Sequence, residues 1–310
     1  MLDFLLQPMG CVVLAALGLG AARCARSYGA VAGRRARCAG QVAIVTGGSS
    51  GIGLAIAHRL AARGMKLVLA ARGAEQLAAA AEELRASGAD VQVVPTDISD
   101  PGACDALVRK TLDAFGRLDL VVACAGIGHH GLASEDDLAL QRKLIEVNHF
   151  GTINTVRAVV PSLLEYGGEL FVMGSISGVV GSPLRTAYCA SKYATMGYVE
   201  SLRLELAMLG TPLPITVCMP GSVDTPFRKH NIGPRPKMSA DECADLAVAG
   251  WERGDYKVYC PTHASLMIWV PPVFGQWTMD LFMKKSASML HRTPRAPPLY
   301  GPNHQVCSSI

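Results

Sequence analysis

Paired cysteines are absent from this chain: its ten cysteines are scattered over 310 residues without one C-x-x-C motif. Histidine and cysteine also lack the spacing of a zinc site, because His129-His130 and Cys260-x-x-His263 have no further ligands at suitable distances along the chain. The pattern excludes a secreted disulfide framework and gives no reason to expect a metal. We expect reduced thiols in a cytosol-like compartment.

An excess of charge is also absent over most of the chain. The net charge is +4, and residues 1–38 account for all of it, because they hold Asp3 and five arginines: Arg23, Arg26, Arg34, Arg35 and Arg37. Of 29 basic residues, 24 remain outside this segment, and of 25 acidic residues, 24 remain. A nucleic-acid-binding protein needs a basic patch or stripe. We therefore expect no nucleic acid partner.

No apolar run near the N-terminus clearly reaches the roughly 20 residues of a membrane-spanning helix. Met9 to Ala22 is uninterrupted for 14 residues, and adding residues 4–7 makes a span marginal. Basic residues follow this run, whereas they precede it in a secretory signal. We interpret residues 1–38 as a membrane anchor in the endoplasmic reticulum, with the rest of the chain facing the cytosol. A transit peptide for mitochondria or another organelle, or neither role, stays open.

A strand, a glycine-rich turn and a helix follow one another early in the chain. Gln41 to Val45 is apolar and rich in β-branched residues, as in a buried strand, and Leu54 to Arg63 is amphipathic. Between them lies Thr46-Gly47-Gly48-Ser49-Ser50-Gly51-Ile52-Gly53. Glycines let the backbone approach a pyrophosphate, and the free N–H groups and the helix dipole hold it. The segment predicts a dinucleotide site, although its spacing differs from G-x-G-x-x-G.

The end of the second predicted strand bears on the choice of cofactor. Met65 to Ala70 ends in Ala71-Arg72, where NAD-binding folds usually place an acid for the ribose 2′-hydroxyl. Ala71 removes that carboxylate, and Arg72 offers a planar fork for a 2′-phosphate. We therefore predict NADP(H) over NAD(H), with a solvated Arg72 of no such role as the alternative.

Tyr188 and Lys192 carry the chemistry that such a cofactor needs. They lie four residues apart, so on a helix they share one face, and Ser175 lies thirteen residues upstream of Tyr188. A nearby positive charge favours the ionised form of a phenol. Such a phenol can give or take a proton at a carbonyl or alcohol oxygen, and a serine hydroxyl can hold the same oxygen.

Strands and helices alternate over the rest of the chain, which predicts an α/β fold with a doubly wound, Rossmann-type parallel sheet of about seven strands in a single domain. The predicted strands are 41–46, 65–70, 91–95, 118–123, 169–174, 214–219 and 256–260. The predicted helices are 52–63, 74–87, 101–115, 136–166 (with a possible break), 187–209 and 239–251. Candidate site residues follow the strands, so we expect them at one edge of the sheet: Gly47, Asp97, Gly126, Ser175 and Pro220.

These motifs together resemble the short-chain dehydrogenase/reductase family of the ordinary, not extended, kind, from about Gln41 to Cys260. The resemblance implies a catalytic tetrad of Asn148, Ser175, Tyr188 and Lys192. It implies cofactor contacts from Thr46, Gly47, Ser49, Ser50, Gly51, Ile52, Gly53, Arg72, Asp97, Ile98, Cys124, Ala125, Gly126, Tyr188, Lys192, Pro220, Gly221, Val223 and Thr225. One position departs from the pattern: Cys124 replaces the asparagine of Asn-Ala-Gly, which should weaken the tie between the central strands.

The resemblance also implies a reaction and a setting. We expect an NADP(H)-dependent oxidoreductase that interconverts a ketone and a secondary alcohol, with Asn148 holding a water beside Lys192. A membrane-attached enzyme should meet lipophilic substrates such as a steroid, a retinoid or a long-chain keto-lipid. It would then be similar to 11-beta-hydroxysteroid dehydrogenase-like and 3-ketodihydrosphingosine reductase-like members. A catalytically silent NADP(H)-binding scaffold or redox sensor is the alternative.

The C-terminal part divides into a lid, an apolar segment and a tail. The resemblance implies that Thr225 to Lys237 is a mobile lid over the substrate. Ala264 to Phe282 is aromatic-rich and apolar, which suits a bilayer interface or, equally, packing on the domain or in a dimer. We divide the chain into residues 1–38, a catalytic domain over 39–262, and an apolar, Pro-rich extension over 263–310, and we expect a homodimer.

Overall fold

A seven-stranded parallel sheet forms the centre of the molecule in the computed structural model, which describes residues 38–134, 136–228 and 238–262. Its strand order is β3-β2-β1-β4-β5-β6-β9, and all neighbouring strands are parallel. The strands are β1 (Val42–Thr46), β2 (Lys66–Ala71), β3 (Val91–Pro95), β4 (Leu120–Ala123), β5 (Glu169–Met173), β6 (Ile215–Pro220) and β9 (Lys257–Cys260). The predicted Rossmann-type fold is confirmed.

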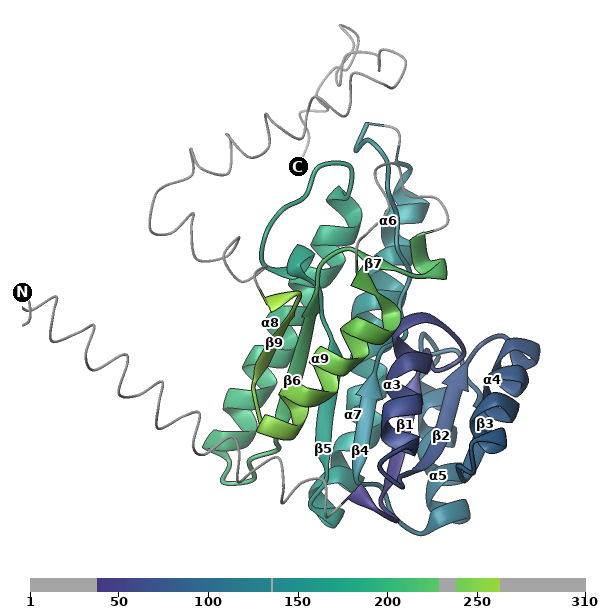
Figure 1. Cartoon of the computed structure of the whole chain (residues 1–310). Coiled ribbons are helices and arrows are strands. Elements are labelled where there is room, and N and C mark those ends of the chain that lie inside the picture. Colours follow the sequence, from purple (N-terminus) through teal and green to yellow (C-terminus); the bar gives the residue numbers. More distant parts are fainter. Residues whose placement is uncertain (1–37, 135, 229–237, 263–310) are drawn as a thin grey trace, which may run out of the picture.

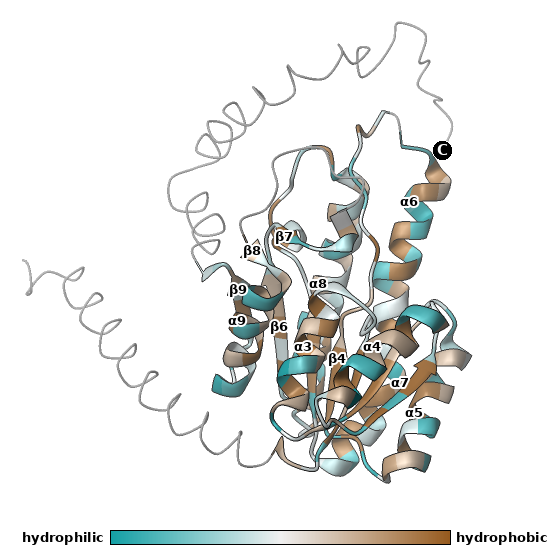
Figure 2. Cartoon of the chain, turned by 45° about the vertical axis from the view of Figure 1, so that its right-hand side comes forward, coloured by the Kyte–Doolittle hydropathy of each residue, from teal (hydrophilic) through white to brown (hydrophobic). Residues whose placement is uncertain are grey.

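Helices cover both faces of this sheet (Figure 1). On one face lie α3 (Gly51–Ala61), α4 (Ala74–Ala86) and α9 (Ala240–Arg253), whose apolar side chains join one core cluster. On the other face lie α5 (Pro101–Phe115), α7 (Gly151–Tyr166) and α8 (Thr186–Met208), which form a second cluster. Because both faces are covered, the strands are nearly continuous apolar runs. In Figure 2, parts of the sheet that are visible between the helices are brown, the colour of hydrophobic residues.

The long helix predicted over 136–166 contains a π-turn. It begins with α6 (Leu138–Ile145), because the carboxylate of Asp137 accepts the N–H of Leu140 and caps it. A π-helical turn, Glu146–Phe150, then leads directly into α7. Pro161 lies inside α7 without ending it. Single π-turns within α-helices are frequent at functional sites, and this one contains Asn148.

Two short strands that we did not predict border the segment after β6. β7 (Val223–Asp224) pairs with β8 (Met238–Ser239) in a separate parallel ribbon, and a 3-10 turn, Pro226–Arg228, follows β7. The predicted irregular lid, Thr225 to Lys237, therefore begins directly after β7 and is followed directly by β8. Its middle, residues 229–237, lies outside the described residues.

The proposed membrane and targeting segments also lie outside the described residues, at positions 1–37 and 263–310. Within the described ranges, none of the helices combines enough length with enough apolar character to cross a bilayer.

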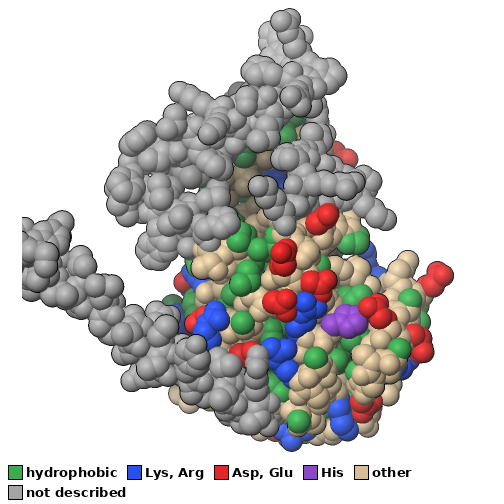
Figure 3. Space-filling view, viewed as in Figure 1, with side chains coloured by type: hydrophobic (Ala, Val, Ile, Leu, Met, Phe, Trp, Pro, Cys, Tyr) green, Lys and Arg blue, Asp and Glu red, His purple; other side chains and the backbone are tan. Residues whose placement is uncertain are grey.

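Ion pairs connect α3 and the turn that follows it to α9. Arg59 of α3 binds Asp241 and Asp245 of α9. In the turn after α3, Nε of Arg63 lies 2.7 Å from Oε1 of Glu252 of α9. In Figure 3, acidic and basic side chains lie next to one another on this face. These pairs stabilise the position of α9 beside α3. Because β9 follows α9 in the chain, they also help to keep the edge strand β9 on the sheet.

Candidate active site

The glycine-rich turn has no room for side chains at two positions. Gly47 has a φ of +68°, and a Cβ there would lie 2.9 Å from the backbone of Ala125. A Cβ on Gly53 would lie 2.3 Å from the carbonyl oxygen of Gly47. The helix α3 that follows has no side-chain cap from Ser50 and no acidic residue in its first turn. Its first N–H groups therefore stay available for an anion.

Thr46 fastens the turn to the next strand of the sheet. Its hydroxyl accepts the backbone N–H groups of Cys124 at 3.1 Å and Ala125 at 3.2 Å, and donates to the carbonyl of Val122 at 3.4 Å. Thr46 does not line the cleft described below, so its place in the structure is that of a brace. These bonds connect the ends of β1 and β4. They do not need a side chain at position 124, where Cys124 replaces the asparagine of the family.

Cys124 itself is a neutral thiol in this setting. Burial raises its pKa to about 12, although the ammonium of Lys192 acts in the opposite direction. A protonated thiol is a weak nucleophile. We therefore assign no covalent chemistry to Cys124.

One cleft of about 470 Å³ lies at the carboxyl ends of the strands. The residues predicted to contact the cofactor all line it, with the single exception of Thr46, and so do Ser175, Tyr188 and Lys192. The cleft is also lined by residues that were not predicted to contact the cofactor, namely Ala70, Ala71, Gly73, Gln76, Thr96, Ile127, Val147, Met173, Gly174, Arg185, Ser222, Pro226 and Phe227.

Positive charge predominates among the lining residues. The lining contains three basic residues, Arg72, Arg185 and Lys192, and one acidic residue, Asp97. Hydrogen bonds from the hydroxyl of Ser99 at 2.7 Å and its N–H at 3.0 Å lower the pKa of Asp97, with a smaller contribution from Arg72. The lining thus suits an anionic ligand such as a dinucleotide.

Tyr188, Lys192 and Ser175 converge on this cleft from two elements. Tyr188 and Lys192 lie on α8, and Ser175 directly follows β5; each of the three is buried. Lys192 Nζ donates to the carbonyl of Met173 at 2.9 Å, which fixes the ammonium at the end of β5. The hydroxyl of Ser175 accepts the N–H of Ser177 at 3.1 Å and begins a 3-10 turn.

Asn148 lies behind these three residues and does not line the cleft. Its side chain accepts the N–H of Ile127 at 2.8 Å and donates to the carbonyl of Ile127 at 2.9 Å. It also donates to the hydroxyl of Ser191 at 3.0 Å. A Cβ on Gly126 would lie 3.0 Å from Asn148 Oδ1 and 4.0 Å from Lys192 Nζ. Asn148 therefore braces the segment after β4 against α8, close to Lys192.

Two side chains that no motif indicated surround the phenol ring of Tyr188. The guanidinium carbon of Arg185 lies 5.1 Å from the ring centroid. The ring of Phe227 packs edge-on at a centroid distance of 5.9 Å. Phe227 is 40% exposed, so it gives the end of the cleft near Tyr188 an accessible aromatic surface. In the sequence, only the position of Arg185, three residues before Tyr188, could have indicated that it belongs to the site.

Fold and cleft together define a nucleotide-dependent dehydrogenase or reductase. The family model for short chain dehydrogenases matches residues 41–234, which is more than half of the chain. The chain therefore belongs to the short-chain dehydrogenase/reductase family, and the expected family is confirmed. Membership of this family supports an oxidoreductase with a nicotinamide dinucleotide as its cofactor.

Relatives with assigned names agree with this membership. Human dehydrogenase/reductase SDR family member 7 is 36% identical over 193 residues, which cover 61% of this chain and 57% of that protein. The match thus spans little more than half of that relative. The 1-deoxy-11-beta-hydroxypentalenate dehydrogenase of Streptomyces avermitilis is 37% identical over 232 residues, covering 72% of this chain and 84% of that protein.

Solved structures of relatives contain both forms of the cofactor. A short chain dehydrogenase/reductase from Burkholderia phymatum in complex with NAD has a TM-score of 0.68 and 26% identity, covering 84% of this chain and 98% of that chain. An alcohol dehydrogenase from Thermococcus sibiricus complexed with 5-hydroxy-NADP has a TM-score of 0.65 and 31% identity, covering 71% and 95%. These likenesses support a dinucleotide and leave the choice between NAD and NADP to the residues of this chain.

Proposed function

We propose that this chain is an NADP(H)-dependent enzyme that interconverts a ketone and a secondary alcohol on a lipophilic substrate. One observation supports the proposal above the others: Ser175, Tyr188 and Lys192 line the same cleft as the glycine-rich turn. A proton donor, a hydroxyl and an ammonium thus face the place that a dinucleotide would occupy. We propose reduction as the physiological direction, because cytosolic NADP is mostly reduced.

The residues present fit the cofactor. The first N–H groups of α3 would hold the pyrophosphate, and the close approach of Gly47 and Gly53 to their neighbours leaves that cradle free of side chains. Asp97 and Ile98 would contact the adenine end. Pro220 to Thr225 would lie over the nicotinamide, since this segment lines the cleft after β6. When bound, the dinucleotide supplies or accepts the hydride.

The chain's own residues would move and hold the proton. Tyr188 would donate it to the substrate oxygen during reduction and accept it during oxidation. The hydroxyl of Ser175 would donate a hydrogen bond to the same oxygen as negative charge develops there. Lys192 has three N–H donors and uses one for Met173, so the others can reach the cofactor ribose.

NADP(H) rather than NAD(H) is proposed on the charges at the end of β2. Arg72 lines the cleft there, and no carboxylate follows β2 at the position where a 2′-hydroxyl would be bound. An arginine can bind a 2′-phosphate with two parallel hydrogen bonds. Gln76 lines the same end and adds neutral donors.

A lipophilic substrate is proposed from the surface near Tyr188. Phe227 and Ile127 line this end of the cleft, next to Tyr188, and offer apolar contacts. The name of the Streptomyces relative describes a dehydrogenase acting on an 11-beta-hydroxylated compound, which is alcohol chemistry of the proposed kind. A steroid, a retinoid or a long-chain keto-lipid would fit the proposal.

Attachment to the endoplasmic reticulum membrane, with the domain facing the cytosol, is a further part of the proposal. It rests on the apolar run and following arginines of residues 1–38 and on the apolar stretch Ala264 to Phe282. An organelle-import signal in residues 1–38 is the alternative, and carbonate extraction of membranes with the intact chain separates the two. A homodimer stays a prediction; exposed Leu204, Met208 and Leu209 at the end of α8 would suit one.

Turnover and cofactor binding, measured together, test the function. We expect the intact chain to oxidise NADPH with at least one ketone from a panel of steroids, retinoids and long-chain keto-lipids. Tyr188→Phe should keep NADPH binding, measured by fluorescence, and lose at least 100-fold in kcat, as is typical when a general acid is removed. NADPH binding without turnover by the unaltered chain would instead favour the catalytically silent scaffold.

A further inference from the structure

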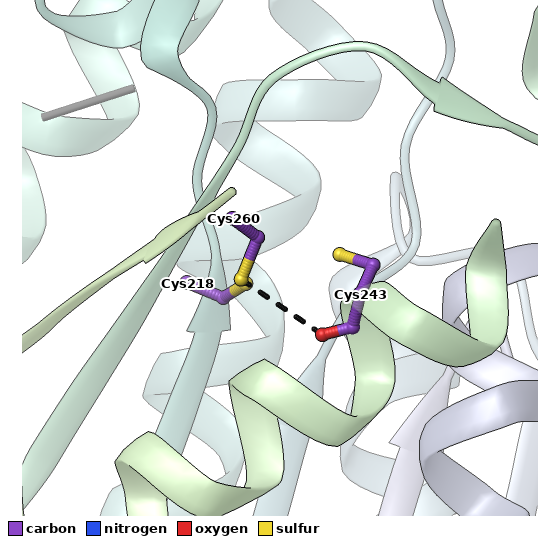
Figure 4. A group of neighbouring side chains, drawn as sticks. All are labelled: Cys218, Cys243 and Cys260. Atoms are coloured by element: carbon purple, nitrogen blue, oxygen red, sulfur yellow. Dashed lines mark hydrogen bonds between the residues drawn. The ribbon is translucent and has the colours of Figure 1, made fainter. Parts of the chain in front are cut away.

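Three cysteines outside the cleft come together in the core. Cys218 lies on β6, Cys243 on α9 and Cys260 at the end of β9. Their sulfur atoms all lie within 4.8 Å of one another, and each residue is 0% exposed. Figure 4 shows the three side chains converging between the two strands and the helix. Because they come from separate elements, no spacing in the sequence indicated the cluster.

The distances suit shared ligands of one ion better than a disulfide. The sulfur atoms of Cys218 and Cys260 are 3.7 Å apart, whereas a disulfide bond is about 2.05 Å long. Two thiolates bound to one ion at about 2.3 Å each lie roughly 4 Å apart. Cys218 pairs with Val258 and Pro220 with Cys260, so the two cysteines are diagonal neighbours on adjacent strands. Diagonal Cα atoms are roughly 8 Å apart, beyond the reach of a disulfide.

The surroundings favour a soft ion over a hard one. The three cysteines belong to the apolar cluster between the sheet and the helices α3, α4 and α9. Within the described residues, the group of possible ligands comprises only these three thiols, without a carboxylate or imidazole. Magnesium and calcium need oxygen ligands, and structural zinc needs four ligands. Thiolates without other donors select soft ions such as Cu(I).

We propose that Cys218, Cys243 and Cys260 form a three-thiolate site for a soft cation of low coordination number, with Cu(I) as the best match. Each thiol that becomes a thiolate releases its proton to solvent, and Cu(I) keeps its oxidation state.

Anaerobic titration with Cu(I) against a chelator of known affinity tests the site in the intact chain. We expect one tightly held ion per chain by native mass spectrometry. Cys218→Ser, Cys243→Ser and Cys260→Ser should each weaken binding at least tenfold. Cys104→Ser is the matched control, because Cys104 is also buried and free but lies on α5, on the other face of the sheet. It should bind Cu(I) as the unaltered chain does.

X-ray absorption of the Cu(I)-loaded unaltered chain keeps the test decisive where a serine variant fails to fold. We expect about three sulfur ligands near 2.3 Å. Nitrogen or oxygen ligands in the spectrum, or equal affinity in a folded variant that lacks all three thiols, would overturn the proposal. The cluster is not part of the proposed catalytic machinery, so neither readout depends on enzyme activity.

Discussion

At the scale of single residues, Arg72 has the most specific role in the proposal. It lines the cleft at the end of β2, where a 2′-phosphate would lie. Arg72→Ala should raise the Michaelis constant for NADPH by about tenfold or more, because a charge-assisted hydrogen bond contributes about 1.5–3 kcal/mol. The constant for NADH should change little. Steady-state kinetics with both cofactors checks this, and equal effects on the two would end the assignment of NADP.

Asp97 and Ser99 should give a pH-dependent contribution to stability. The hydroxyl and N–H of Ser99 lower the pKa of Asp97 in the folded chain, so folding favours the ionised carboxylate. That contribution is complete above the unfolded pKa, near 4, and is lost as the pH falls through the lower folded value.

Ser99→Ala removes the hydroxyl bond and should lower the free energy of unfolding by less than about 1 kcal/mol at pH 7, because Asp97 is partly exposed. The difference from the unaltered chain should shrink as the pH falls below about 4. Urea unfolding at several pH values measures it. A difference that grows toward low pH would contradict the sign of the shift.

Single residues also mark what could be predicted from the sequence. The glycines, Ser175, Tyr188 and Lys192 were identifiable because the spacing along one strand, turn or helix determines their arrangement. Arg185 was not, and Phe227 was included only as part of the predicted lid, because both reach Tyr188 through the folding of loops around it. Thr46 was assigned to the cofactor, and the structure places its hydroxyl on the backbone of the next strand instead.

At the scale of elements, the π-turn between α6 and α7 supports the site. It places the side chain of Asn148 against both backbone groups of Ile127 and against Ser191. Asn148→Ala should cost about 3 kcal/mol of stability, because buried polar groups would lose their partners. Chemical denaturation measures that loss. Asn154→Ala is the control, since its side chain also donates to backbone carbonyls of a neighbouring loop but is less buried, and it should cost about 1 kcal/mol.

Kinetics separates bracing from a direct role of Asn148. A brace predicts that Asn148→Ala lowers both stability and kcat. A fall in kcat with unchanged stability would mean that Asn148 acts at the reacting groups and not through Ile127 and Ser191.

Most elements could be predicted because their signals are local. Each predicted strand of the main sheet overlaps an observed one, and continuous apolar runs in a buried parallel sheet are easily identified. The π-turn was not predicted, and the bonds that accompany it run from Asn148 to Ile127, which lies 21 residues away in the sequence. The ribbon of β7 and β8 was missed for a similar reason: two residues per strand leave no periodic pattern.

At the scale of the whole molecule, the fold gathers residues from most of its length at one edge of the sheet. The cleft draws on segments from Gly47 to Phe227, each at or near the end of a strand or the start of a helix. This convergence needs β6 and β9 to stay in place, since Pro220 and Gly221 follow β6 and the N–H of Gly221 binds the carbonyl of Cys260. Contacts that hold α9 and β9 on the sheet should therefore affect the cleft.

The ion pair between Arg63, in the turn after α3, and Glu252 of α9 is such a contact. The carboxylate of Glu252 is almost fully buried, so Arg63→Ala leaves a buried charge without this partner and should destabilise the fold by roughly 3 kcal/mol. Arg59→Ala removes pairs to the exposed Asp241 and Asp245 and should cost about 1 kcal/mol or less. Urea unfolding of both variants, with NADPH affinity measured alongside, checks the expected order. Equal losses of unfolding free energy in the two variants would show that the burial of Glu252 does not make its ion pair with Arg63 stronger than the exposed pairs of Arg59.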